Sequence, residues 1–214
     1  MQPYFLPYIG YFRLISKVDY FVIFDDVNYI KRGWINRNYF SINGEAKLLT
    51  LKVKKASINK KINELFLLDD SVEEVKKTLQ QSYNKNPFSN EVIDRLLKPS
   101  SLFDNKLSHY LSWQLQEISS YLSLDAKFIC SSSLNILDEL RGQDRVIEIC
   151  KVLGATEYFN LPGGRSLYEV EKFKESRIEL TFLPELGDLD SKLSFFDTMT
   201  KYSVNDLTKM IGVM

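Results

Sequence analysis

Two adjacent carboxylates and several basic side chains share the segment DDVNYIKRGWINRN, residues 25–38. Asp25 and Asp26 could bind Mg²⁺ or accept a proton, and Lys31 and Arg37 could hold a phosphate or carboxylate group. The alternative is a solvated loop whose charges pair with one another. We favour a functional loop, because loops held by fixed aromatic side chains are frequent positions for binding sites.

The opening segment QPYFLPYIGYF, residues 2–12, is rich in aromatic residues and proline. It could be a rigid turn that fills the core, but Gly10 at the start of a helix would also let a phosphate or sugar approach the backbone. The tetrad from Tyr8 to Tyr11 has the shape of the HIGH signature of nucleotidylyltransferases, with tyrosine in both histidine positions. Because both key residues differ, the match is weak support for that chemistry.

A third segment, NLPGGRSLY at residues 160–168, places Pro162, Gly163 and Gly164 between an expected strand and an expected helix. A tight turn before a helix N-terminus can bind an anion, and Arg165 could contact a phosphate. The glycine spacing matches neither a P-loop nor a dinucleotide fingerprint, so a structural turn explains the segment nearly as well.

Two common kinds of active site are disfavoured. His109 is the single histidine, which argues against a zinc site and against a Ser-His-Asp triad. Cys130 and Cys150 lie in apolar stretches, as inert structural thiols often do. We therefore expect no zinc site and assign no metal-ligating residues, and classical covalent hydrolysis is disfavoured.

The second half of the chain alternates apolar strand patterns with helix patterns. This alternation predicts right-handed crossovers and an α/β fold with a mostly parallel sheet flanked by helices, nucleotidyltransferase-like or Rossmann-like. Ligands of such sheets bind beyond the carboxyl ends of the strands, here after Phe24, Cys130 and Asn160. The expected strands are 19–24, 126–130, 156–161 and 178–183, and the helices between them are 142–154 and 166–176.

Elsewhere the patterns predict a short helix over 7–16, a strand over 46–53 after an Asn43-Gly44 turn, and one or two helices in the tail, 193–214, with Ser203 as a cap. A helical segment at about 71–121 is inserted in the middle of a single domain, 1–214. It contains a helix from a Ser71 capping box to about residue 81 and a second helix over 103–121.

The 214 residues carry 28 basic and 28 acidic side chains, so the overall charge favours no nucleic acid partner. No signal peptide, membrane-spanning stretch or disulfide framework is recognisable, which predicts a cytoplasmic protein. A strand usually precedes a segment such as MQPYFLPYIGYF. We expect either that this strand is missing or that the numbered start lies within the native protein.

These segments, with NGEAKLLTLKV, KKINEL, SYNKNPF, SSSLNI, QDRVIEICKVLGATEYFN and LSFFDTM, resemble the WbqC-like family over nearly the whole chain. The resemblance implies that the protein acts on a small activated sugar during the synthesis of bacterial surface polysaccharides such as O-antigen. The positions that it carries over as candidate site residues are Gln2, Tyr8, Gly10, Tyr11, Asp25, Asp26, Lys31, Arg37, Asn38, Asn160, Gly163, Gly164 and Tyr168.

Three functions follow as hypotheses. The first is a transferase or ligase that modifies an amino group of a nucleotide-linked sugar, with Asp25 or Asp26 as base or Mg²⁺ ligand and with Lys31 and Arg37 on phosphate. The second is nucleotidyl transfer from a nucleoside triphosphate with Mg²⁺. The third is a sugar-binding or scaffold protein without catalysis. The cofactor stays open, with Mg²⁺ and a nucleotide as the candidate, and the oligomeric state is not predicted.

Overall fold

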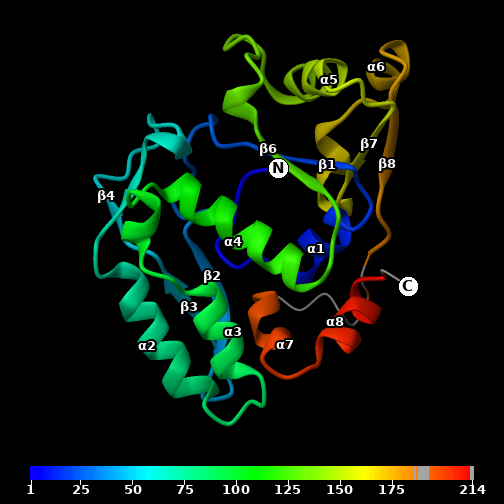
Figure 1. Cartoon of the computed structure of the whole chain (residues 1–214). Coiled ribbons are helices and arrows are strands. Elements are labelled where there is room, and N and C mark those ends of the chain that lie inside the picture. Colours follow the sequence, from blue (N-terminus) through cyan, green and yellow to red (C-terminus); the bar gives the residue numbers. More distant parts are fainter. Residues whose placement is uncertain (186, 188–192, 213–214) are drawn as a thin grey trace.

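The computed structural model describes residues 1–185, 187 and 193–212. Figure 1 shows the chain from its N-terminus beside β1 and β6 to the C-terminal helices. The strands are β1 (Tyr20–Ile23), β2 (Arg37–Ile42), β3 (Glu45–Thr50), β4 (Val53–Lys54), β5 (Phe66–Leu67), β6 (Lys127–Cys130), β7 (Glu157–Asn160) and β8 (Glu179–Phe182). The α-helices are α1 (Ile9–Ile15), α2 (Ser71–Tyr83), α3 (Ser89–Leu96), α4 (Leu107–Tyr121), α5 (Gly142–Val152), α6 (Val170–Glu175), α7 (Phe195–Met199) and α8 (Val204–Ile211). Short 3₁₀ helices are η1 (Ile62–Glu64), η2 (Ser100–Phe103), η3 (Ser131–Ser133) and η4 (Pro162–Leu167).

The strands form several small sheets within a mixed α/β structure. β1 pairs with β6 and β7 with β8, both in parallel, while β2–β3 and β4–β5 are antiparallel. The α/β class is therefore confirmed, but the single, mostly parallel sheet is not, because each sheet among the described residues has two strands. A cavity of about 390 Å³ is lined by residues of both β1 and β7, which belong to separate sheets.

The crossover helices follow the expected order. α5 connects β6 to β7, and α6 connects β7 to β8. The second crossover helix begins later than expected, at Val170, because the Pro162-Gly163-Gly164 turn continues as η4. Both pairs thus present their carboxyl ends to short polar connections, as the sequence predicted.

The middle of the chain is helical, but its expected capping box is wrong. Asp70 occupies the N-cap position of α2, and Ser71 is the first residue of the helix. The Ser71 hydroxyl accepts a hydrogen bond from the backbone amide of Lys52 at 2.5 Å, and Glu74 forms an ion pair with the Lys52 ammonium. Contacts with Lys52, in the connection between β3 and β4, therefore replaced the local cap. α3 was not predicted.

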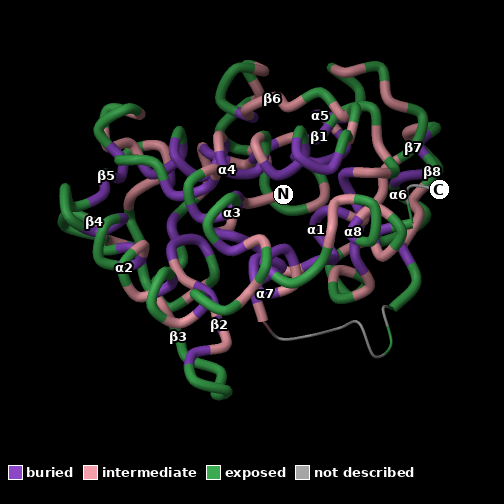
Figure 2. The backbone as a smooth tube through the Cα atoms, turned by 60° about the horizontal axis from the view of Figure 1, so that its bottom comes forward, coloured by how far each residue is buried: buried purple, intermediate pink, exposed green. Residues whose placement is uncertain are grey.

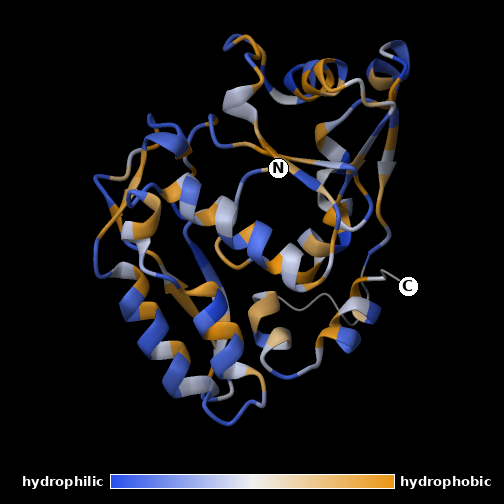
Figure 3. Ribbon diagram, in the orientation of Figure 1, coloured by the Kyte–Doolittle hydropathy of each residue, from blue (hydrophilic) through white to orange (hydrophobic). Residues whose placement is uncertain are grey.

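Most buried side chains form one large cluster around α1, α4 and α7, with Tyr11, Tyr110 and Phe195 at most 1% exposed. A smaller cluster joins Val146 and Cys150 of α5 to Phe173 of α6 and to the start of β8. Figure 2 shows the buried stretches running through the centre and the exposed ones in the outer loops. In Figure 3, hydrophobic residues lie where β1 and β6 run side by side.

The tail packs back on the body as two helices, as predicted, and residues 213–214 lie outside the described part. The Ser203 side chain caps α8 by accepting a hydrogen bond from the Asp206 amide, which confirms that cap. Ser194 caps α7 and donates a hydrogen bond to the Leu6 carbonyl at 2.6 Å. This contact ties the end of the chain to the opening segment.

Candidate functional site

Asp25 follows β1 and is held by groups from two other segments. Its Oδ1 accepts a hydrogen bond from the backbone amide of Ser132 at 3.0 Å and lies 3.3 Å from the Ser131 hydroxyl oxygen. Its Oδ2 accepts hydrogen bonds from the Ser132 hydroxyl at 2.7 Å and from the Asn63 side-chain amide at 3.4 Å. Asp25 is buried, so this carboxylate holds the ends of β1 and β6 and the η1 segment in a fixed arrangement.

Asp26 forms a buried ion pair with Arg145 on α5. The distance from its Oδ2 to Nη2 is 2.5 Å, and the two side chains are 11% and 6% exposed. The other Asp26 oxygen accepts a hydrogen bond from the Ser131 hydroxyl, and Arg145 also donates to the Leu137 carbonyl at 3.3 Å. A buried pair is costly to break, because the surviving charge is left without a partner. The pair therefore locks α5 to the end of β1.

A polar cleft of about 490 Å³ opens beside this network, which is within the usual range for small-molecule sites. One wall carries Lys61 and Asn63, and the other carries Asp138 and Glu139. Lys61 forms an ion pair with Asp138 at 3.0 Å across the cleft. Its lining offers hydroxyl, amide, carboxylate and ammonium groups; the lining residues are Asp26, Lys61, Asn63, Ser131, Ser132, Asn135, Ile136, Leu137, Asp138 and Glu139.

The remaining predicted residues of the 25–38 segment lie apart from this lining. Lys31 is exposed, and Arg37 donates hydrogen bonds to the carbonyls of Gly33, at 2.9 Å, and Arg32. Asn38 is buried in β2, where its amide donates to the Leu6 carbonyl at 2.7 Å. Arg37 thus stabilises its own loop, and Asn38 connects β2 to the opening segment.

The opening segment is mainly a packing unit in this structure. Tyr11 is buried and its hydroxyl donates to the Gln2 carbonyl at 2.8 Å; burial raises the pKa of Tyr11 well above its ordinary value. A Cβ at Gly10 would lie 2.4 Å from the Tyr8 ring, so only glycine fits there without a shift. The Met1 carbonyl accepts a hydrogen bond from the Phe24 amide at 2.8 Å, which places Gln2 at the same end of β1 as Asp25.

The predicted residues after β7 form a second, uncharged group. The Asn160 amide donates to the Tyr158 hydroxyl at 3.2 Å, and Tyr158 and Tyr168 share a hydrogen bond of the same length. Burial and the neighbouring Tyr168 raise the pKa of Tyr158 well above its ordinary value. Gly164 packs on the Asn160 side chain, whereas a Cβ at Gly163 would meet open space.

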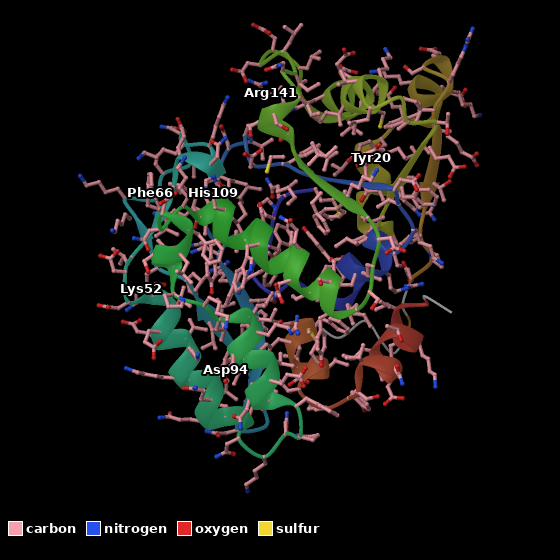
Figure 4. The ribbon with its side chains drawn as sticks, in the orientation of Figure 1. Tyr20, Lys52, Phe66, Asp94, His109 and Arg141 are labelled. Atoms are coloured by element: carbon pink, nitrogen blue, oxygen red, sulfur yellow. The ribbon has the colours of Figure 1, made fainter. Side chains whose placement is uncertain are left out.

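The histidine and the thiols offer little reactivity. His109 is exposed on α4 (Figure 4). Arg141 lies just before α5, close along the chain to residues 135–139 of the cleft lining. Burial raises the pKa of the Cys150 thiol to about 11, and burial together with the Asp25 charge raises that of Cys130. Both thiols therefore stay protonated at neutral pH, where a thiolate would be needed for nucleophilic attack.

The carboxylates do not form a metal-ligand set. Both oxygens of Asp25 accept hydrogen bonds from protein groups, and Asp26 is paired with Arg145. Among the described residues no group of three or more His, Cys, Asp or Glu side chains is arranged to hold a metal. The Mg²⁺ considered from the sequence does not fit this arrangement of donors.

Comparison with known proteins assigns the sequence to a family. A sequence model of the WbqC-like protein family matches residues 2–201. The chain belongs to the WbqC-like protein family. It is similar to "Uncharacterized protein Rv1507c" of Mycobacterium tuberculosis (strain ATCC 25618 / H37Rv), with 29% identity over 218 residues that cover 99% of this chain and 92% of that protein. No solved structure matches the chain.

Several site residues of this WbqC-like protein were not predicted. Lys61 and Asn63 lie near η1, far along the chain from Asp25, and no local pattern marks them. Arg145 sits on α5 as an ordinary charged helix residue, and its partner is 119 positions away. The serines of η3 could have been selected, because they directly follow an expected strand.

Among the described residues no helix is long and apolar enough to cross a membrane.

Proposed function

We propose that this WbqC-like protein is an enzyme of bacterial surface-polysaccharide (O-antigen) biosynthesis. It acts as a transferase or ligase on an amino group of a nucleotide-linked sugar. The observation that supports this proposal most is the polar cleft at the joint ends of β1 and β6, lined by a buried acid, hydroxyl groups and Lys61. Family membership supports the sugar context.

The lining of the cleft suits a hydroxylated, partly charged ligand. Ser132, Asn63 and Asn135 supply hydrogen-bond donors and acceptors of the kind that sugar hydroxyls need. Lys61 can exchange its ion pair with Asp138 for a phosphate oxygen of the nucleotide. Lys61 therefore takes the phosphate role that the sequence assigned to Lys31 and Arg37.

The two adjacent aspartates take different roles in this proposal. Asp26 lines the cleft, and its Oδ1, which accepts one hydrogen bond from Ser131 and keeps a second lone pair, can accept the proton that a sugar ammonium must lose before its nitrogen forms a new bond. Asp25 does not line the cleft, and its oxygens position Ser131 and Ser132. Asp25 is thus a positioning residue, and Asp26 is the candidate general base.

The proposal is tested by turnover with a panel of UDP- and dTDP-linked amino sugars and acyl donors. Because general-base catalysis contributes about 10²–10⁴-fold, Asp26→Asn should lower kcat by that order, while a sugar nucleotide still raises the melting temperature. Asp144→Asn is the matched control, since it makes the same substitution at an exposed carboxylate of α5 outside the cleft lining and should leave kcat nearly unchanged. Circular dichroism verifies that each variant is folded at the assay temperature.

Undiminished turnover in a folded Asp26→Asn variant would remove the base assignment. Binding of a sugar nucleotide without turnover by any donor would instead favour the sugar-binding protein. Nucleotidyl transfer receives no support from the described contacts, because Tyr11, in a histidine position of the HIGH-like tetrad, is buried and bonded to the Gln2 carbonyl. It remains a prediction that a triphosphate screen can check.

A further inference from the structure

The basic side chains of the protein are not distributed evenly along the chain. Residues 27–63 carry nine basic side chains and one acidic side chain, Glu45, whereas the rest of the chain carries 19 basic and 27 acidic side chains. The balanced overall charge therefore masks one strongly basic region. The proposed chemistry uses one of its nine cations, Lys61.

Two loops of this region lie side by side; they are residues 30–34 and 55–60, and we call them the paired loops. The Tyr29 amide donates a hydrogen bond to the Lys60 carbonyl at 2.8 Å, and an antiparallel bridge joins Asn28 to Lys61. In Figure 1, the chain before β2 and the chain after β4 lie at the same corner of the molecule, away from α7 and α8. The two loops therefore contribute to one surface.

The paired loops contain no acidic residue, and their cations form no ion pair with a described residue; these cations are Lys31, Arg32, Lys55 and Lys60. The carboxylates that border the loops are already paired, because Asp69 binds Lys54 at 3.2 Å and Asp138 binds Lys61 at 3.0 Å. The positive charge of the paired loops is therefore available to an external anion.

Large apolar side chains stand among these cations. Ile30, Trp34 and Ile58 are 51%, 43% and 59% exposed, and the Trp34 ring packs against Tyr39 with the ring centroids 5.8 Å apart. Tryptophan favours the boundary between water and membrane, and apolar side chains among Lys and Arg are typical of surfaces that lie on a bilayer. Nucleic acid suits this surface less well, because isoleucine side chains cannot stack on bases as aromatic rings do.

We propose that the paired loops bind the surface of an anionic lipid bilayer. Their cations contact the lipid phosphates, and their three exposed apolar side chains enter the boundary between headgroups and acyl chains. Lys61 directly follows the second loop and lines the polar cleft, so the bound protein holds this cleft close to the lipid surface. The binding surface is distinct from the groups proposed to act in catalysis.

The test is sedimentation of the full chain with vesicles made of equal parts phosphatidylglycerol and phosphatidylcholine, and with vesicles of phosphatidylcholine alone. The chain should sediment with the first vesicles only, and added salt should release it. Each Lys or Arg near an anionic bilayer contributes about fivefold in affinity, so the double variant Lys31→Gln, Arg32→Gln should bind about 30-fold more weakly.

The matched control is the double variant Lys151→Gln, Arg177→Gln, which removes the same two kinds of charge from exposed positions outside the basic region. Arg177 also matches Arg32 in backbone conformation, with φ values of 59° and 64°. The control should bind the vesicles as the unmodified chain does. Circular dichroism verifies that each variant is folded.

Tryptophan fluorescence measures insertion directly. The chain has two tryptophans, so the variant Trp113→Phe leaves Trp34 as its single one. With phosphatidylglycerol vesicles, the Trp34 emission should move to shorter wavelengths and be quenched by brominated acyl chains, because the ring leaves water.

Three results would each overturn the proposal: no sedimentation with phosphatidylglycerol vesicles, equal weakening by the two double variants, or an unchanged Trp34 emission in the vesicle-bound chain. Tighter binding to polyuridylate RNA than to the vesicles would also overturn it and would identify a nucleic acid partner. Binding is measured without substrate or turnover, so this outcome is separate from that of the proposed enzyme activity.

Discussion

The two parallel pairs end in different chemistry. After β1 and β6, buried charges dominate, with Asp26 paired to Arg145 and Asp25 surrounded by hydroxyl and amide donors. After β7, the polar atoms are neutral and are shared among Asn160, Tyr158 and Tyr168. At the charged end the buried Arg145 Nε has no hydrogen-bond partner among the described residues, and only this end faces the polar cleft.

This difference distinguishes a candidate binding site, after β1 and β6, from a structural turn, after β7. Neutral hydrogen bonds close the β7 end, whereas the buried ion pair after β1 and β6 carries a desolvation cost. We therefore propose that the chemistry takes place after β1 and β6 and that the β7 end supports the fold.

The largest effect should come from breaking the charged end. Arg145→Met leaves the Asp26 carboxylate buried without its partner and should lower the free energy of unfolding by about 3–5 kcal/mol, measured by urea denaturation. Adding Asp26→Asn to the same chain should restore part of this loss, because no unpaired charge remains. If Arg145→Met alone costs less than about 1 kcal/mol, the contrast between the two ends does not hold.

The second effect concerns the amino group of Met1, which borders the cavity between β1 and β7. Burial lowers the pKa of the Met1 amino group from 8.0 to about 5, so between these values the unfolded chain binds a proton that the folded chain does not. The free energy of unfolding should therefore rise by about 2–4 kcal/mol between pH 5 and 8 because of this group, and become constant above pH 8.

The control for this pH effect is a chain acetylated at Met1, which cannot gain the proton. Subtracting its stability curve from that of the free chain removes every other titrating group. A difference that does not depend on pH would show that the Met1 amino group is solvated rather than buried.

The smallest effect is expected at the neutral end. A Cβ at Gly164 would lie 3.0 Å from the Asn160 amide nitrogen, so Gly164→Ala must displace that side chain and should cost about 1 kcal/mol. Gly163→Ala is the matched control, because its Cβ meets open space and the substitution should be neutral or stabilise by up to about 1 kcal/mol. Equal thermal shifts for both variants would argue against a specific role for Asn160.

Sequence patterns were sufficient for elements whose causes are local. The strand ends at Cys130 and Asn160 and the Ser203 cap could all be read from neighbouring residues, whereas β1 ends at Ile23, one residue before the predicted Phe24. The Ser71 cap failed because the Lys52 amide, 19 positions away, took its hydroxyl. Asn38 looked like a site residue, but it bonds to the Leu6 carbonyl, a contact that exists only after folding.

The same limit explains the site and the sheet. Asp25 and Asp26 could be chosen from the sequence because they follow a strand, but their partners Arg145 and Asn63 are brought to them by tertiary packing. The alternation predicted the order of strands and helices correctly, yet it carries no information about how far apart two strands lie. The cavity between β1 and β7 depends on that distance.

The ion pair between Lys61 and Asp138 makes the electrostatics of the cleft sensitive to salt. Both side chains are substantially exposed, and exposed pairs are weak and screened by salt. At the proposed site an anionic ligand competes with Asp138 for Lys61. The affinity of an anionic ligand should therefore fall as the ionic strength rises, whereas that of a neutral ligand should change little.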